Sequence, residues 1–147
     1  FTKLILNFVK ENGLEENQLG LEITETAELE DRNKAAFAFE TLKENGVPLA
    51  LDDFGAGYSS LSYLRDLPIS LIKLDKNFAN TIDLSDTKEL VKFVVNISNN
   101  LKLDMLVEGI ETLEQKNEFM NLGCKRGQGY FFHRPEFLED FIENYGE

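Results

Sequence analysis

The sequence predicts an α/β protein in which a parallel sheet is covered by helices, and three observations lead to this prediction. Short runs of apolar and β-branched residues alternate with segments whose apolar residues recur at helical spacing. Each predicted strand is followed by a helix before the next strand begins, which is the order that parallel strands require. No linker or low-complexity tract interrupts the 147 residues, so we expect one domain unit over residues 1–147.

The predicted strands are short and apolar, and most of them end in polar residues. They cover residues 20–26, 47–51, 69–75, 104–111 and 125–132. The predicted helices cover residues 1–12, 31–45, 59–66, 86–101, 113–122 and 135–144. Pro68 ends the third helix, and Pro135 suits the first turn of the last one.

Composition excludes some classes of partner. The formal net charge is -12, with 27 acidic residues against 15 Lys and Arg. This balance argues against DNA binding and against an anionic membrane surface, because both need a basic face. Cys124 is the single cysteine, so no intrachain disulfide can form and a reducing compartment is favoured. Since no apolar run approaches the roughly 20 residues of a membrane span, we expect a cytoplasmic domain, although a parent protein could be membrane-anchored.

Acidic residues gather where the predicted strands end. Four of the five strands deliver carboxylates to the same edge of a parallel sheet, and the third also delivers a lysine. The strand-end residues are Glu22, Glu25, Asp52, Asp53, Lys73, Asp75, Glu108 and Glu111, with Gln128 in the fifth strand. Like charges at one buried edge are unfavourable unless cations compensate them. Because carboxylate oxygens suit hard cations, the pattern predicts a Mg2+ or Mn2+ site.

Two metal ions held by bridging carboxylates suit the hydrolysis of a phosphate ester. No nucleophile and base pair is visible, since His133 and Cys124 lie late in the chain and near neither acidic pair. Plainer interpretations stay open at this point. The pair Asp52 and Asp53 could be a solvated acidic turn, and Lys73 could be an ion-pair partner of Asp52 or Asp75. Likewise, Glu25 and Glu111 could be surface acids, and Gln128 could bond a backbone carbonyl.

Five segments in this order and spacing resemble the EAL domain family. They are residues 21–26 (LEITET), 52–61 (DDFGAGYSSL), 72–75 (IKLD), 107–112 (VEGIET) and 128–130 (QGY). The resemblance implies hydrolysis of the bacterial second messenger cyclic di-GMP to linear pGpG. It also implies a TIM-like (β/α)8 barrel, of which this chain holds the later five strands. The Glu-Ala-Leu motif itself is absent, so we expect either a truncated domain or missing strands supplied by another chain.

The resemblance also implies roles for the strand-end residues. Glu22 and Asp52 ligate the first metal, and Asp52 bridges to the second. Asp53 holds the second metal, with Glu108 beside it as a ligand or water activator. Lys73 positions and polarises the attacking water.

Further roles follow from the same resemblance. Glu25 holds the loop 54–60, which shapes the site and the dimer contact. Asp75 and Glu111 support the pocket, which Gln128 also lines. The segment from Tyr130 to Pro135 packs against a guanine. The family's flanking sensory or GGDEF domains, and a homodimer, are possible partners.

Three hypotheses therefore stand. The chain is the later part of a cyclic di-GMP phosphodiesterase domain, or a catalytically inactive module that binds cyclic di-GMP or regulates a partner. The third possibility is a partly unfolded chain, because five strands of a barrel leave two edges open to pairing or aggregation.

Overall fold

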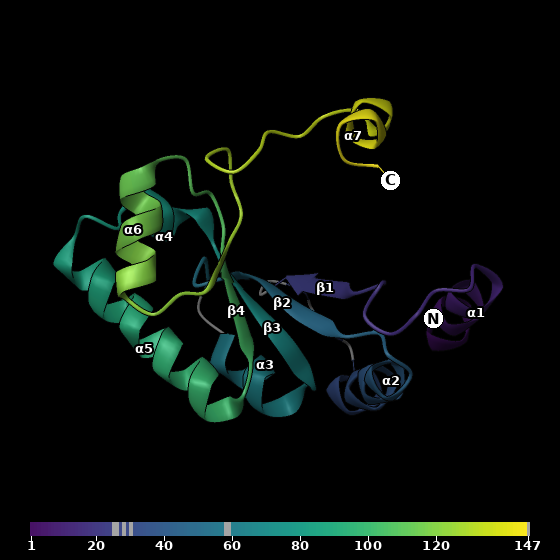
Figure 1. Cartoon of the computed structure of the whole chain (residues 1–147). Coiled ribbons are helices and arrows are strands. Elements are labelled where there is room, and N and C mark those ends of the chain that lie inside the picture. Colours follow the sequence, from purple (N-terminus) through teal and green to yellow (C-terminus); the bar gives the residue numbers. More distant parts are fainter. Residues whose placement is uncertain (25–26, 28, 30, 58–59, 147) are drawn as a thin grey trace.

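A computed structural model describes residues 1–24, 27, 29, 31–57 and 60–146. Five parallel strands form one sheet in the order β1-β2-β3-β4-β5, so each strand lies beside its neighbour in the chain (Figure 1). The strands are Leu21–Thr24 (β1), Leu49–Phe54 (β2), Ile69–Leu74 (β3), Asp104–Val107 (β4) and Arg126–Gly127 (β5). The predicted parallel α/β arrangement is confirmed.

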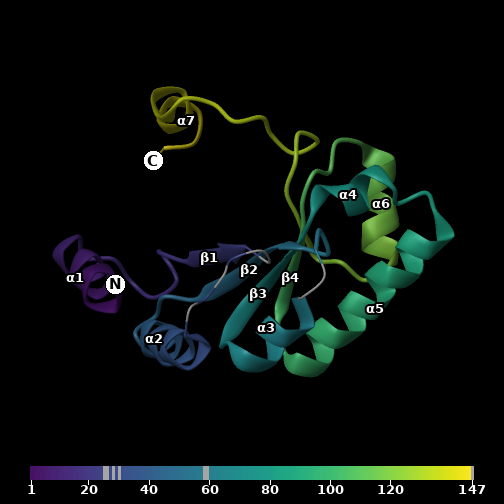
Figure 2. The same ribbon diagram turned by 180° about the vertical axis from the view of Figure 1, so that it is seen from behind.

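Helices connect the strands, and the first and last helices lie apart from the sheet. Their bounds are Thr2–Glu11 (α1), Arg32–Glu44 (α2), Ser60–Asp66 (α3), Lys76–Asn80 (α4), Ser85–Leu101 (α5), Leu113–Asn121 (α6) and Leu138–Tyr145 (α7). In Figures 1 and 2, α2 and α3 lie below the sheet and α4, α5 and α6 gather at one side of it, whereas α7 stands above it at the end of an extended segment. None of the described helices combines the length and apolar character needed to cross a membrane.

The predicted bounds of four elements differ clearly from the structure. The second strand covers Leu49–Phe54 rather than residues 47–51, so Asp52 and Asp53 lie within it and not after it. The fourth strand ends at Val107 rather than at residue 111, because the chain turns at Gly109 with φ +70°. The fifth strand is two residues long, because Gly129 takes φ +153° and Phe132 N donates to Gly129 O in a turn. Tyr130 to Phe132 therefore do not alternate across a strand. The last helix begins at Leu138 rather than at Pro135.

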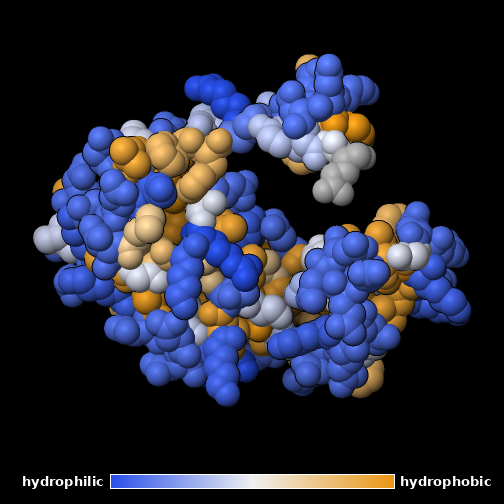
Figure 3. All heavy atoms as spheres, in the orientation of Figure 1, coloured by the Kyte–Doolittle hydropathy of each residue, from blue (hydrophilic) through white to orange (hydrophobic). Residues whose placement is uncertain are grey.

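The core lies between β2, β3 and β4 and the helices beside them. Leu51, Ile72, Leu74, Val91 and Val107 are each fully enclosed. By contrast, no residue of α1 or α7 is buried. Phe1, Leu4 and Phe8, in and just before α1, are exposed, and Figure 3 shows hydrophobic surface in this part of the molecule.

Within the described chain the sheet is open. The strand β1 pairs with β2, β5 pairs with β4, and neither has a second described partner. The carboxyl edge of this open sheet carries the acidic residues.

Candidate active site

A bulge in β2 brings two adjacent acids to one place. Successive side chains of a regular strand point to opposite faces, so Asp52 and Asp53 should diverge. The register, however, runs from Leu51 opposite Ile72 to Phe54 opposite Leu74, which places one extra residue in β2. Asp53 takes the left-handed conformation, with φ +54°. Both carboxylates consequently lie on the same side of the sheet edge.

Asp52, Asp53 and Glu108 form a cluster that fits a metal ion. One carboxylate oxygen from each lies within 4.8 Å of the others, and all three residues are half-buried. The Oδ1 atom of Asp52 is buried, and the ammonium group of Lys73 lies 2.8 Å from it, so this oxygen already faces a cation. Hard oxygen donors in this number suit Mg2+ or Mn2+.

Lys73 supplies the positive charge of this edge. Its Nζ lies 2.8 Å from Asp52 Oδ1, 2.9 Å from Glu108 Oε1 and 3.0 Å from Glu22 Oε2. The residue is only 8% exposed. Burial lowers the pKa of Lys73, but contacts with Asp52, Glu108 and Glu22 outweigh it, so the pKa lies above its ordinary value. An ion pair between Lys73 and Asp52 was one of the plainer interpretations. The structure contains this ion pair, and Lys73 also forms ion pairs with Glu22 and Glu108.

The remaining strand-end residues occupy different positions. Glu22 contacts Lys73 but lies outside the three-carboxylate cluster. Asp75 is buried and caps α4, since its Oδ1 accepts from Asn77 N at 2.9 Å. Glu111 is exposed in the turn before α6, where its backbone N donates to Gln115 Oε1 at 2.8 Å. Glu25 lies outside the described residues.

Gln128, Tyr130 and Pro135 line one hollow of about 490 Å3 between the end of β5 and α7. Arg134 lines it too, with its guanidinium 4.6 Å from the centre of the Tyr130 ring. Sequence reasoning missed Arg134, although its position beside Pro135 and among aromatic residues was a signal. The structure thus separates an acidic centre from an aromatic and cationic hollow.

The family model described as the EAL domain matches residues 1–135. This chain belongs to the EAL domain family. Solved EAL domains also share its fold: the crystal structure of the EAL domain of Mycobacterium smegmatis DcpA superposes with a TM-score of 0.91 at 29% identity. That superposition covers 97% of this EAL chain and 65% of the DcpA domain. The sheet is accordingly part of the TIM-like barrel of this family.

Named relatives of the EAL chain act on or bind cyclic di-GMP. The bifunctional diguanylate cyclase/cyclic di-GMP phosphodiesterase MucR of Pseudomonas aeruginosa is 37% identical over 139 residues, which cover 94% of this chain and 20% of MucR. A manganese and cyclic di-GMP complex of Klebsiella pneumoniae BlrP1 has a TM-score of 0.83 at 31% identity, over 90% of this chain and 34% of that chain. The EAL chain spans about a fifth of the length of the first curated relatives that it matches.

Proposed function

We propose that residues 1–147 are the metal-binding part of a cyclic di-GMP phosphodiesterase domain, namely its C-terminal five β/α units. One observation carries the proposal: Asp52, Asp53 and Glu108 converge beside Lys73 at the carboxyl edge of an EAL sheet. The reaction is hydrolysis of cyclic di-GMP to linear pGpG.

Asp52, Asp53 and Glu108 hold the metal ions in this proposal, and Glu22 contributes from β1. Mg2+ and Mn2+ both fit the oxygen donors, and the BlrP1 complex contains manganese. When bound, such ions lower the pKa of water and neutralise charge on a phosphate oxygen. Asp52 belongs to the cluster and also contacts Lys73, and in this proposal it would be the ligand that two ions share.

Lys73 keeps its proton on Nζ throughout and orients oxygen atoms. An ammonium group has three N–H donors, and three carboxylates surround this one. For Lys73 to donate to the attacking water, at least one of these carboxylates must turn away. Its role is therefore to position and polarise the water rather than to accept its proton.

The hollow between the end of β5 and α7 is proposed to bind a guanine base. Gln128 and Tyr130 offer hydrogen bonding and a ring face, and Pro135 adds an apolar wall. Arg134 adds a positive charge, which offsets part of the net charge of -12 when the anionic dinucleotide approaches. Asp75 and Glu111 are proposed to support this pocket, and Glu25 the loop 54–60.

The partners are proposed from the family. MucR is named as both cyclase and phosphodiesterase, which supports flanking GGDEF or sensory domains. A homodimer, or a chain that supplies missing strands, would cover the open sheet edges. The proposed location is cytoplasmic.

The test is an assay of the purified chain with cyclic di-GMP and Mn2+, in which chromatography detects pGpG. Product from the wild-type chain would show that the missing strands are dispensable or supplied by a second copy, whereas no product would assign the activity to the longer domain. Asp52→Asn should lower the rate at least about 100-fold, because it removes a charged metal ligand. Asp83→Asn is the matched control, since Asp83 is an exposed acid in the turn before α5 and should keep wild-type activity.

Glu22→Ala controls for contaminating phosphodiesterase. Product that persists in both Glu22→Ala and Asp52→Asn would contradict the proposed site. The second candidate is a catalytically inactive module that binds cyclic di-GMP. Calorimetric binding of cyclic di-GMP without product would select that candidate.

A further inference from the structure

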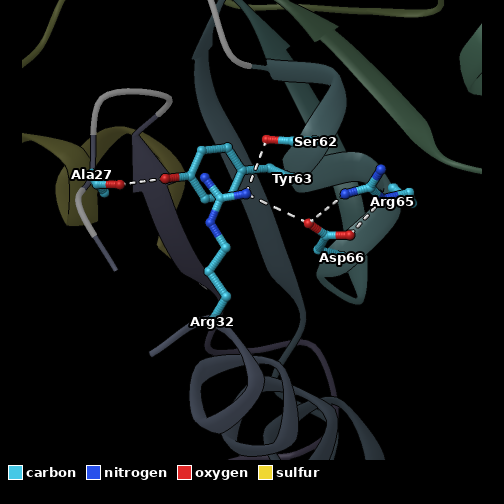
Figure 4. Close-up of polar contacts among 6 residues, drawn as sticks. All are labelled: Ala27, Arg32, Ser62, Tyr63, Arg65 and Asp66. Carbon is cyan, nitrogen blue, oxygen red and sulfur yellow. Dashed lines mark hydrogen bonds and ion pairs between the residues drawn. The ribbon is translucent and has the colours of Figure 1, made fainter. Parts of the chain in front are cut away.

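We propose that Tyr63 and Arg32 are positioning residues, which clamp the connection between β1 and α2 to α3 and so hold Glu22 and Asp52 in place. This inference rests on the proposed metal centre. Figure 4 shows the clamp: Tyr63 of α3 reaches Ala27 in the connection, and Arg32 at the start of α2 reaches toward α3. None of these side chains belongs to the acidic cluster, so the clamp acts from outside the site.

The first attachment is a hydrogen bond from the Tyr63 hydroxyl to the backbone oxygen of Ala27 (Figure 4). Tyr63 is 4% exposed, and Ala27 packs against the hydrophobic core. The backbone oxygen of Ala27 accepts the hydrogen bond of this buried hydroxyl. Removing the hydroxyl alone therefore takes one hydrogen bond from Ala27 and leaves the Tyr63 ring in place.

The second attachment holds the start of α2. Arg32 is the first residue of this helix, and its guanidinium lies 5.2 Å from the centre of the Tyr63 ring. Its Nη1 is 3.5 Å from Asp66 Oδ2 and 3.3 Å from Ser62 Oγ (Figure 4). Arg32 therefore stacks on the same ring whose hydroxyl holds Ala27. Ala27 and the first residue of α2 are thus both attached to α3.

A continuous set of contacts links the clamp to the metal centre. The Ala27 N donates to Thr24 O at 3.0 Å, which fixes the turn at the end of β1. In the β1–β2 register Thr24 lies opposite Asp52, and Glu22 lies two residues earlier on the same short strand. Among the described strands, β1 pairs with β2 alone. The clamp therefore gives the end of β1 an additional attachment to the rest of the molecule.

The helix α3 follows the turn that leaves the bulge of Asp52 and Asp53. One helix is thus attached through the chain to β2 and through side chains to the segment after β1. The clamp sets the spacing between the strand ends that carry Glu22 and Asp52. Loosening it should change metal affinity without removing any ligand.

The test compares Tyr63→Phe and Arg32→Ala with matched controls. Tyr145→Phe removes a hydroxyl from an exposed tyrosine. Within the described part of the chain, the contacts of Tyr145 are between its ring and other rings, and none involves the hydroxyl. Arg65→Ala removes an arginine that pairs with the same Asp66 but belongs to α3 itself, so it leaves the connection attached. Two quantities are measured: the Mn2+ dissociation constant by calorimetry, and backbone amide exchange by NMR.

We expect Tyr63→Phe to raise the Mn2+ dissociation constant roughly 3- to 10-fold, which corresponds to the loss of one hydrogen bond. Exchange at the amides of Ala27 and of residues 52–54 should accelerate by a similar factor. Amides in the middle of α5, such as Val91 and Val94, should keep wild-type exchange. Arg32→Ala should act in the same direction, whereas both controls should match the wild type.

The outcomes separate the clamp from the proposed function. A wild-type chain that binds no Mn2+ refutes the metal centre and the positioning role together. A wild-type chain that binds Mn2+, with unchanged affinity in Tyr63→Phe, overturns the clamp alone. Equal acceleration of exchange at Val91 and Val94 would also overturn it, because Tyr63 would then contribute only to global stability.

Discussion

Lys73 balances the acidic edge of the sheet with a single side chain. Three carboxylates lie within 3.0 Å of its Nζ, and two of them belong to the metal-binding set. A buried charge that loses its partner costs far more than an exposed pair gains. Lys73 is thus a structural residue as well as a proposed catalytic one.

Lys73→Met should lower the free energy of unfolding by about 3 kcal/mol, at the low end of the range for broken buried ion pairs because Glu22 is half exposed. Added Mn2+ should restore more stability to this variant than to the wild type, since the cation replaces the lost charge. Lys92→Met is the control, because its pair with Glu89 is exposed and contributes about 0–1 kcal/mol. Urea unfolding with and without Mn2+ measures both effects, and equal losses in the two variants would contradict the expectation.

The pH dependence of this stabilisation follows from the raised pKa of Lys73. A cationic group with a raised folded-state pKa stabilises the fold fully below its unfolded-state pKa, near 10.5. The contribution is lost as the pH rises through the higher folded-state value. The stability difference between wild type and Lys73→Met should therefore stay constant from about pH 7 to 10 and shrink only above that. Urea titrations across this window test it, and a difference that falls between pH 7 and 9 would contradict it.

Cys124 should resist alkylation in the folded chain. Burial raises the pKa of its thiol to about 12, and the thiolate is the reactive form. Iodoacetamide at pH 8 should modify native Cys124 at least about 100-fold more slowly than the urea-unfolded chain, as measured by mass spectrometry. Similar rates in the two states would show that the strand β4 and helix α6 do not enclose this residue.

The grouping of Asp52 and Glu108 could be predicted from the sequence, because the carboxyl ends of parallel strands meet at one edge. Asp53 was placed at the same edge because the strand was predicted to end at residue 51, whereas β2 continues to Phe54. Alternation along a strand places Asp53 opposite Asp52, and only the register with β3 reveals the extra residue. Arg134 was missed because its contact with Tyr130 depends on a turn rather than on a strand.

At the scale of elements, α4 and α6 are held together by a side chain of the capping box. Thr112 Oγ1 accepts from Gln115 N, while Gln115 Oε1 accepts from Thr112 N at 3.0 Å. Gln115 Nε2 also donates to Ala79 O at 3.0 Å, which is part of α4. One residue thus completes the cap of α6 and joins it to a second helix.

Gln115→Ala should destabilise the chain by about 2 kcal/mol, because it removes capping bonds and a bond between helices. Asp31→Ala, which removes the plain cap of α2, should cost about 1 kcal/mol. Thermal unfolding of both variants compares the two, and an equal or smaller cost for Gln115→Ala would mean that the link to α4 contributes nothing.

Long helices such as α5 could be predicted within a residue, because their apolar stripe extends over several turns. The five-residue α4 escaped prediction, since it shows less than two turns of periodicity and depends on the cap at Asp75. The strand β5 was predicted too long because aromatic residues favour strands, whereas the backbone of Gly129 starts a turn.

At the scale of the whole molecule, two open sheet edges coexist with a high negative charge. The strands β1 and β5 each expose unpaired backbone groups within the described chain. The net charge of -12 opposes contact between copies at low ionic strength. Edge pairing and charge repulsion therefore act against each other.

Salt should promote self-association of the chain. Raising ionic strength from about 0.01 M to 0.15 M shortens the screening length from roughly 30 Å to 8 Å, which weakens the repulsion and leaves the edges unchanged. Sedimentation velocity should show a larger associated fraction at the higher salt. A monomer at both salt concentrations would indicate that the edges are protected.

The three carboxylates around Lys73 have a consequence for the order of events during biosynthesis. A site built from acids alone would repel itself in a newly made chain until metal arrived, and folding would wait for metal supply. Here Lys73 supplies a positive charge from the chain itself, so the acidic strand ends can come together during folding before any metal ion is bound. In the proposed function, the supply of metal ions then determines whether the folded protein has metal bound, and not whether the chain folds.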